Sequence, residues 1–211
     1  MSTLALTIAP RRPNTTARVA FQVACAVAGS LVIAGLAQAQ IHLAFTPVPI
    51  TGQTLGVLLV GAAYGPALGL ATLALYLLEG VVGLPVFAAQ ADGSHLTGTA
   101  VLAFSSATGG YLFGFALAAG LVGWLARRGW DRSFGSAIGA MLLGEVVVYA
   151  VGLPWLKHAL PGLTTQPASW ELTLEQGLYP FVVGDTIKLL LAAGLLPGAW
   201  QLLRRFRPEE S

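Results

Sequence analysis

Charged residues are scarce in this sequence. Asp, Glu, Lys and Arg make up 9% of the 211 residues, whereas they make up about a quarter of a soluble protein. Residues 19–78 contain none of them, and residues 93–126 and 189–203 are two further uncharged windows. A transmembrane helix needs about twenty apolar residues, and these runs lack the alternation of barrel strands. The composition therefore indicates an all-α integral membrane protein with several membrane-spanning helices and the lipid bilayer as its surroundings.

Several devices of enzymes are also missing. The single cysteine, Cys25, excludes an intramolecular disulfide or a cysteine metal cluster. The three histidines, His42, His95 and His158, are far apart, so a metal hydrolase is not expected. Neither a P-loop for ATP nor a serine nucleophile motif occurs. We therefore expect no enzymatic activity, no cofactor and no metal, and a net charge of +2 gives no reason to expect a nucleic-acid partner.

Four helices can be placed directly, and one stretch is ambiguous. The clear spans are residues 19–38, 107–126, 134–153 and 179–203. Residues 52–83 would run about 48 Å as one helix, whereas the hydrocarbon core is about 30 Å thick. The alternative is two short helices that are divided at Gly65-Pro66.

The positions of the arginines decide between these alternatives. Basic residues near membrane spans are concentrated on the cytoplasmic side. Three clusters hold nine of the eleven basic residues: Arg11, Arg12 and Arg18; Arg127, Arg128 and Arg132; and Arg204, Arg205 and Arg207. Only the divided alternative places all three on one side. We predict six transmembrane helices in a membrane domain of residues 19–204, with cytoplasmic segments 1–18 and 205–211 at the two ends. The first helix resembles a signal peptide, and we interpret it as retained because its loss would break this pattern.

The same alternation of sides across six helices places the long, nearly uncharged connections outside: residues 39–51, 84–106 and 154–178. They are too rich in proline, glycine and polar residues to lie as free coil in lipid. We expect them to lie in water or to fold back as a lid.

Ionisable residues inside the membrane cost at least about 2.5 to 3.5 kcal/mol each, and they are usually functional. Four occur here: Glu79, Glu145, Asp185 and Lys188. Asp185 and Lys188 are three residues apart and share one helix face, and the predicted topology puts all four in the outer half of the membrane. We predict an outward-facing polar cavity. The alternatives are a self-neutralising Asp185–Lys188 pair that only eases insertion, and a Glu79 side chain that extends to water.

The first helix carries three alanines at four-residue spacing, Ala20, Ala24 and Ala28. Small residues at this spacing let a second helix approach closely. The face could serve packing inside the protein or docking of a separate membrane protein, and the sequence leaves both open.

Four motifs in order resemble the signatures of the BioY family, the biotin-specific S component of energy-coupling factor transporters. They are Pro47–Gln53, Gly83–Phe87, Thr108–Phe115 and Gly184–Lys188, and the resemblance extends over nearly the whole chain. Two departures affect the loops: Ala107 replaces the usual proline, and residues 88–104 lack the usual glycine-rich loop.

The resemblance implies a biotin-binding subunit in the plasma membrane of a prokaryote, which works with a transmembrane coupling subunit and two ATPases. It implies that Asp185 and Lys188 contact biotin and that the alanine face of the first helix docks the coupling subunit. The ureido ring of biotin offers two N–H donors and one carbonyl, which a carboxylate and an ammonium can satisfy, and its apolar fused ring suits Phe87 and Tyr111. Gln53, Glu79 and Glu145 complete the candidate site. A rival hypothesis is a self-sufficient proton-coupled carrier with Glu145 and Asp185 as its relay.

Overall fold

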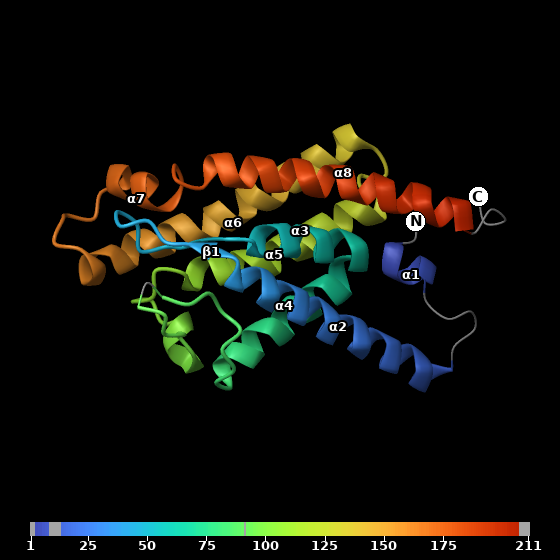
Figure 1. The fold of residues 1–211 in the computed structure, drawn as a ribbon, viewed down its shortest axis with the longest axis horizontal. Coiled ribbons are helices and arrows are strands. Elements are labelled where there is room, and N and C mark those ends of the chain that lie inside the picture. Colours follow the sequence, from blue (N-terminus) through green and yellow to red (C-terminus); the bar gives the residue numbers. More distant parts are fainter. Residues whose placement is uncertain (1–2, 9–13, 91, 207–211) are drawn as a thin grey trace.

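The computed structural model describes residues 3–8, 14–90 and 92–206, and it is mostly helical (Figure 1). Arg11, Arg12 and Arg207 of the basic clusters lie outside the described residues. The elements, in chain order, are α1 (Leu4–Ile8), α2 (Thr15–Gln38), β1 (Gln40–Ile41), β2 (Ile50–Thr51), α3 (Gln53–Tyr64), α4 (Pro66–Val81), the 3₁₀-helix η1 (Gly98–Leu102), α5 (Gly109–Arg127), α6 (Phe134–Leu163), α7 (Trp170–Gly177) and α8 (Val182–Phe206).

Four described helices, α2, α5, α6 and α8, are long and apolar enough to cross a membrane, whereas α3 and α4 are shorter apolar helices. The predicted division at Gly65-Pro66 is confirmed. Gly65 has a positive φ of 82°, which a glycine adopts without strain, and Pro66 is the first residue of α4. The chain therefore reverses at this turn.

The segment after residue 153 differs from the expectation. It was predicted to be a connection, but α6 continues to Leu163 and α7 follows. Pro154 and Pro161 lie inside α6. Each proline removes one helical hydrogen bond, but Leu156, Ala159 and Leu160 are buried in this extension. The packing of these side chains offsets the lost hydrogen bonds. The helix therefore continues past Pro154, where the sequence predicted a connection.

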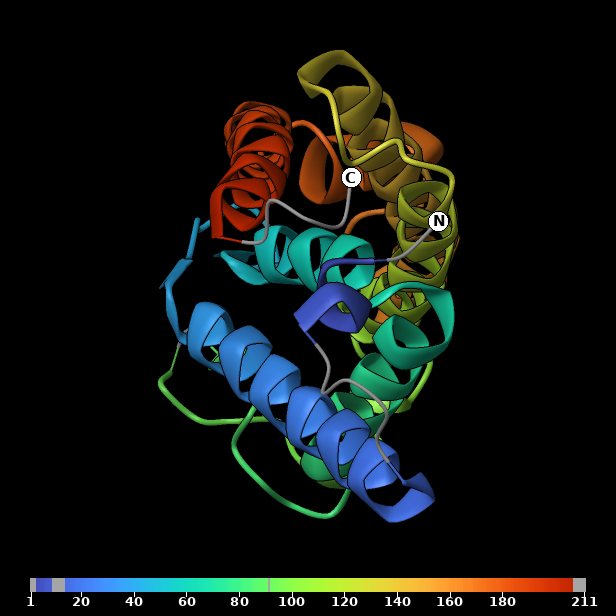
Figure 2. The ribbon, with the colours of Figure 1, turned by 90° about the vertical axis from the view of Figure 1, so that its right-hand side faces the viewer.

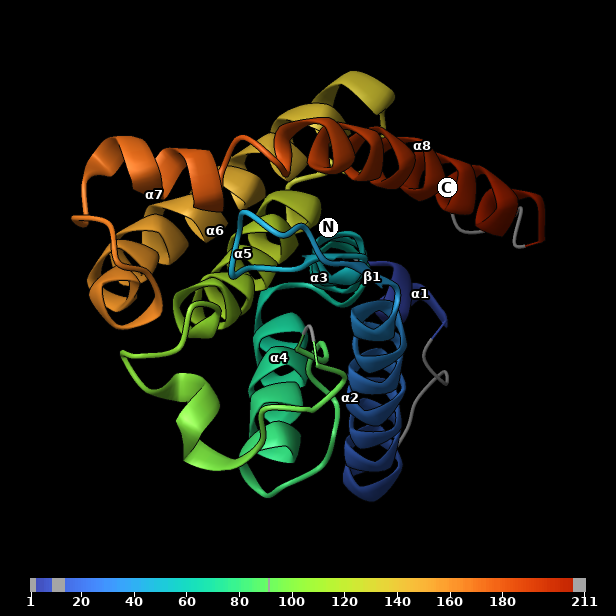
Figure 3. The same ribbon diagram turned by 60° about the vertical axis from the view of Figure 1, so that its left-hand side comes forward.

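Helix α5 is the centre of the helical arrangement, since it packs against α3, α4 and α6. Helix α2 packs on α3 and α4, and α8 packs on α3 and α6. Viewed from one end, α3 therefore lies between α2 and α8 (Figure 2). A view from the other side shows α2 and α8 on opposite flanks of α3 (Figure 3).

The long connections lie at the opposite end of the described structure from α1 and the end of α8. In Figure 1 the segments 40–52, 84–90 and 92–108 and helix α7 lie to the left, while α1 and the end of α8 lie to the right. The segment 40–52 contains the antiparallel pair β1–β2, with Gln40 opposite Thr51 and Ile41 opposite Ile50. A bridge between Ala89 and His95 folds the next connection back on itself.

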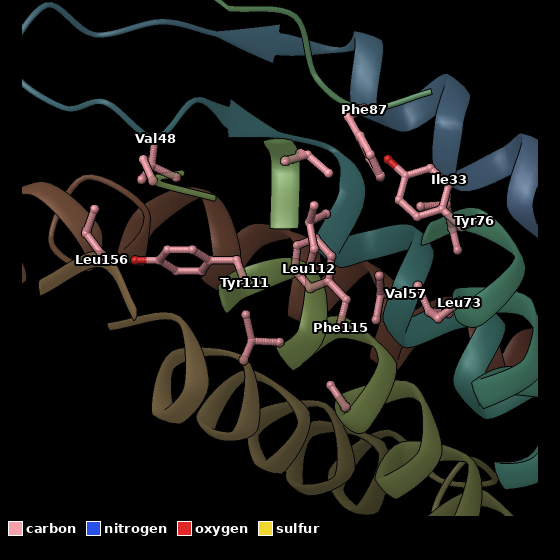
Figure 4. Packing of buried hydrophobic residues seen from close by; sticks show 14 of the residues in the cluster. Ile33, Val48, Val57, Leu73, Tyr76, Phe87, Tyr111, Leu112, Phe115 and Leu156 are labelled. Atoms are coloured by element: carbon pink, nitrogen blue, oxygen red, sulfur yellow. The ribbon is translucent and has the colours of Figure 1, made fainter. Parts of the chain in front are cut away.

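The main core contains side chains from each of the helices α2, α3, α4, α5 and α6 and from the connection that follows α4. Tyr111, Leu112 and Phe115 of α5 belong to one buried cluster with side chains of α2, α3 and α4 (Figure 4). At its edge the ring of Phe87 meets that of Tyr76 edge-on, with centroids 5.2 Å apart. This contact fixes the connection after α4 against the helices.

Candidate functional site

A cavity of about 520 Å³ lies among the long connections and the adjoining helix ends. Ligand pockets commonly measure about 300 to 1,000 Å³, so this one can enclose a small molecule. Its lining comes from β2, α3, α5, α6 and α8 and from the connections. The lining includes His42, Thr46, Val48, Thr51, Gln53, Thr54, Phe87, Ala107, Tyr111, Leu112, Phe115, Val148, Tyr149, Phe181, Asp185 and Lys188.

Asp185 and Lys188 lie on one face in the first turns of α8, where they form an ion pair. The Lys188 Nζ lies 2.6 Å from the Asp185 Oδ1. The same ammonium donates to the backbone oxygen of Thr51 and to the Thr54 Oγ1, both at 2.8 Å. An ammonium has three hydrogens to donate, so Lys188 uses all of them within the chain and ties β2 and α3 to α8.

The Asp185 carboxylate collects donors from three helices. Besides Lys188, its Oδ1 accepts from the Thr54 Oγ1 at 3.3 Å, and its Oδ2 accepts from the Tyr149 hydroxyl of α6. Asp185 also lies near the start of α8, where the partial positive charge of the helix dipole stabilises a carboxylate. Thr54 and Tyr149 were not predicted from the sequence, because an uncharged hydroxyl in an apolar helix carries no sign that it faces an ion pair.

The apolar wall of the cavity contains both predicted aromatic residues. Phe87 and Tyr111 are buried and line the cavity. The Tyr111 hydroxyl donates to the Gly177 backbone oxygen at 2.9 Å, so it also holds the end of α7 in place. The Phe87 carbonyl accepts from the Gln38 Nε2 at 3.3 Å and lies 3.0 Å from the His95 Nδ1. These bonds fix the Phe87 backbone beside the cavity.

Gln53, one of the candidate binding residues, lines the cavity, and its amide also connects the loops. Its Oε1 accepts from the Thr51 hydroxyl at 3.0 Å, and its Nε2 donates to the Tyr76 hydroxyl at 2.8 Å. The Tyr76 hydroxyl in turn donates to the Val86 carbonyl at 3.0 Å. This chain of hydrogen bonds links β2, α3, α4 and the connection after α4.

The two predicted glutamates do not line the cavity. Glu79 turns toward α2, where its Oε1 accepts from the Ser30 hydroxyl at 2.9 Å. Glu145 is buried on α6, and neither of its oxygens has a hydrogen-bond partner among the described residues. The predicted topology indicated how deep each glutamate lies in the membrane. Whether a side chain reaches the cavity depends also on the face of the helix that carries it, and these two glutamates lie on other faces.

The alanine face of α2 points away from the rest of the chain. Ala20, Ala24 and Ala28 are exposed, while Gly29 and Ile33 lie on the buried side of the helix. Internal packing among the described residues therefore does not use this face.

Among the described residues, no three His, Cys, Asp or Glu side chains are close enough to hold a metal ion. His42 lines the cavity, and its Nε2 lies 3.0 Å from the Ala89 carbonyl. This contact joins the connection before α3 to the connection after α4. The cavity lining combines the Asp185–Lys188 ion pair, hydroxyl groups and an apolar wall.

A model described as the BioY family matches residues 10–205. The "Biotin transporter BioY" of Thermotoga maritima is 33% identical over 164 residues, which cover 78% of this chain and 86% of that protein. The "Biotin transporter BioY" of Rhizobium etli is 33% identical over 160 residues, with coverage of 72% and 78%.

A solved structure is similar over almost the whole chain. It is titled "Crystal structure at 2.1 A of the S-component for biotin from an ECF-type ABC transporter". Its TM-score is 0.71 and its sequence identity 25%, and the match covers 94% of this chain and 97% of that one.

Proposed function

Since the chain belongs to the BioY family, we propose that it binds biotin in the cavity as the substrate-binding subunit of an energy-coupling factor transporter. The observation that carries the proposal is the Asp185–Lys188 pair on the wall of a cavity of about 520 Å³. A carboxylate can accept from ureido N–H groups, and an ammonium can donate to a carbonyl or carboxylate oxygen.

The rest of the lining supports the same ligand. The fused ring of biotin is apolar, and Phe87 and Tyr111 provide an apolar surface of suitable size. Because Lys188 already uses its three hydrogens, a ligand oxygen would replace one of its present acceptors. Tyr149 and Thr54 would hold Asp185 during this exchange.

The proposed topology has six crossings, both termini in the cytoplasm and the cavity open to the outside of a prokaryotic plasma membrane. Two distributions support it. The described arginines of the three clusters lie in or beside the helix ends away from the cavity, and the long, nearly uncharged connections lie around the cavity. Basic residues favour the cytoplasmic side. Biotin would therefore enter from outside.

The energy for uptake is proposed to come from separate subunits. The sequence contains no P-loop, so a transmembrane coupling subunit and two ATPases would supply it. The exposed alanine face of α2 offers a surface on which a partner helix can approach closely.

The direct test is to purify the full chain from cells grown with biotin and to identify bound small molecules by mass spectrometry. We expect biotin, and we expect calorimetric titration of the emptied protein to give saturable binding at one site. Saturable binding of another vitamin with no binding of biotin would reject the proposed substrate. Uptake by the reconstituted chain alone, driven by a pH gradient, would instead favour the proton-coupled carrier.

A further inference from the structure

Glu145 of α6 is a buried carboxyl group that has no hydrogen-bond partner among the described residues. The residue is 6% exposed, and both of its carboxyl oxygens are buried. The other two buried carboxyl groups of the described chain, Asp131 and Asp185, each accept at least one hydrogen bond. A buried polar group without a partner costs free energy. Glu145 would therefore be stabilised by any arrangement that brings a donor to it.

Glu145 lies on the side of α6 that faces α8, and these two helices pack against each other. Four residues after Glu145, the Tyr149 hydroxyl donates to Asp185 of α8. Four residues before it, Met141 belongs to a buried cluster that includes Leu189 of α8. Residues four apart lie on the same face of a helix, so Glu145 is placed between two residues that both pack toward α8.

The residue before Glu145 faces other helices. A Cβ added at Gly144 would lie 2.7 Å from the Leu58 Cδ2 of α3 and 2.7 Å from the Val122 Cγ2 of α5. Successive residues of an α-helix are about 100° apart around its axis. Glu145 is therefore directed away from the contact with α3 and α5, in agreement with its place on the α8 side.

Glu145 and Lys188 lie at the same depth in the molecule. The chain runs along α6 toward α7 and returns along α8, so the two helices are antiparallel (Figure 1). The bond between Tyr149 and Asp185 sets their register. Along the helix axes, Glu145 lies about 6 Å from Tyr149 and Lys188 about 4.5 Å from Asp185, both in the direction away from α7. The two residues are therefore at levels that differ by less than about 2 Å.

We propose that Glu145 is the second carboxyl partner of Lys188. Lys188 now donates to the Asp185 Oδ1. When N–H groups of the ligand take this oxygen, the ammonium turns to Glu145, while Thr54 and Tyr149 keep Asp185 in place. The four-carbon stem of lysine is flexible enough for such an exchange.

This exchange offsets part of the cost of separating Asp185 from Lys188, because Glu145 gains the donor that it lacks. Lys188 and Asp185 line the cavity, whereas Glu145 lies just behind its wall. Glu145 is thus a positioning residue that acts through Lys188 and does not touch the ligand. The inference rests on the proposed function, since it requires a ligand with N–H donors at Asp185.

The test is a double-mutant cycle, with biotin affinity measured by titration calorimetry on the purified full chain. Glu145→Met removes both acceptor oxygens at nearly constant length, and it should weaken biotin binding about tenfold. In a Lys188→Met background the same substitution should change the affinity by less than about twofold, because the ammonium is gone. Glu145→Gln keeps one acceptor oxygen and should lose only about threefold.

The melting temperature without biotin separates this role from a structural one. Glu145→Met removes no hydrogen bond that the described structure contains, so the biotin-free variant should melt at the original temperature or above it. The matched control is Glu175→Met, which changes an exposed glutamate of α7 outside the cavity lining and should leave biotin affinity unchanged.

Three results would overturn the proposal: unchanged affinity in Glu145→Met, an equal loss of affinity with and without Lys188, or a lowered melting temperature of the biotin-free variant. If the methionine variant does not fold, the cycle with Glu145→Gln decides in the same way. An unmodified protein that does not bind biotin would reject the proposed function and this inference with it. Biotin binding with additive effects of the two substitutions would reject this inference alone.

Discussion

At the scale of single residues, the ion pair on α8 is one part of a larger network. Lys188 contacts Thr51, Thr54 and Asp185, and Asp185 also accepts from Tyr149. A pair that only eased insertion would need none of these additional partners. Breaking a buried pair on one side leaves an uncompensated charge, whereas removing both charges leaves none. This difference separates a structural role from a role in ligand binding.

We expect Asp185→Asn, Lys188→Met and the double variant all to bind biotin more weakly. Each single change removes a charge-assisted hydrogen bond worth about 1.5 to 3 kcal/mol, which is roughly a ten- to hundredfold loss of affinity. The double variant should bind no better than the weaker single variant. Titration calorimetry measures these affinities, and Lys157→Met is the control at a lysine outside the cavity lining. Near-native affinity in the double variant would show that the pair is structural.

Tyr149 should contribute through Asp185. Tyr149→Phe removes the hydroxyl that donates to the Asp185 Oδ2 and keeps the ring on the cavity wall. We expect biotin affinity to fall about tenfold, because a hydrogen bond to a charged group is lost. Tyr179→Phe changes an exposed tyrosine just before α8 and should have no effect. Equal affinities of the two variants would argue against a role for Tyr149.

At the scale of secondary-structure elements, close approach between helices depends on glycine. A Cβ added at Gly123 of α5 would lie 2.4 Å from the Gly65 carbonyl carbon and 2.6 Å from the Pro66 nitrogen. Both are backbone atoms of the turn between α3 and α4, so no side chain can move aside. The packing of α5 against this turn therefore requires a residue without a side chain.

Gly123→Ala should lower the melting temperature of the purified protein. Overpacking costs about 1 to 3 kcal/mol, which exceeds the gain of about 1 kcal/mol that alanine brings to a helix interior. Gly194→Ala in α8 is the matched control, since an added Cβ there would meet nothing within 4 Å. That variant should be as stable as the original or more stable. A Gly123→Ala protein that melts at or above the original temperature would contradict the close packing.

The exposed face of α2 leads to a prediction about assembly. Ala24→Leu should spare biotin binding and should block copurification with the proposed coupling subunit, because leucine prevents the close approach of a partner helix. Ala150→Leu changes an exposed alanine on α6 and should leave both properties intact. Unchanged copurification of the Ala24→Leu variant would remove the α2 face from the interface.

At the scale of the whole molecule, the two ends differ in chemistry. One end has the cavity and the long connections, and the other has the arginines that the structure describes. If the first end faces outward, residues in its connections should be accessible to reagents that do not cross the membrane.

Cysteine labelling in intact cells checks this orientation. In a background with Cys25→Ala, cysteines at Asp92 and Ser169 should react with an impermeant thiol reagent, because both residues are exposed in connections near the cavity. A cysteine at Arg128 should react only after the membrane is permeabilised. External labelling at residue 128 would overturn the proposed six crossings.

The sequence by itself determined the class of protein, most helix boundaries and the placement of Asp185 and Lys188 on one helix face. Uncharged windows marked the apolar helices, Gly65-Pro66 marked the turn, and the spacing of three residues placed Asp185 and Lys188 on one face. These features depend on composition and local geometry, which a single chain segment contains.

Only the tertiary structure decided which side chains reach the cavity. Glu79 turned to Ser30, Glu145 stayed outside the lining, and Thr54 and Tyr149 joined Asp185. The extension of α6 beyond Pro154 was likewise decided by packing. In a soluble helix the apolar stripe indicates the buried face, but these helices are apolar on nearly all sides. Lipid and protein interior are equally apolar, so the rotation of each helix is set by its neighbours.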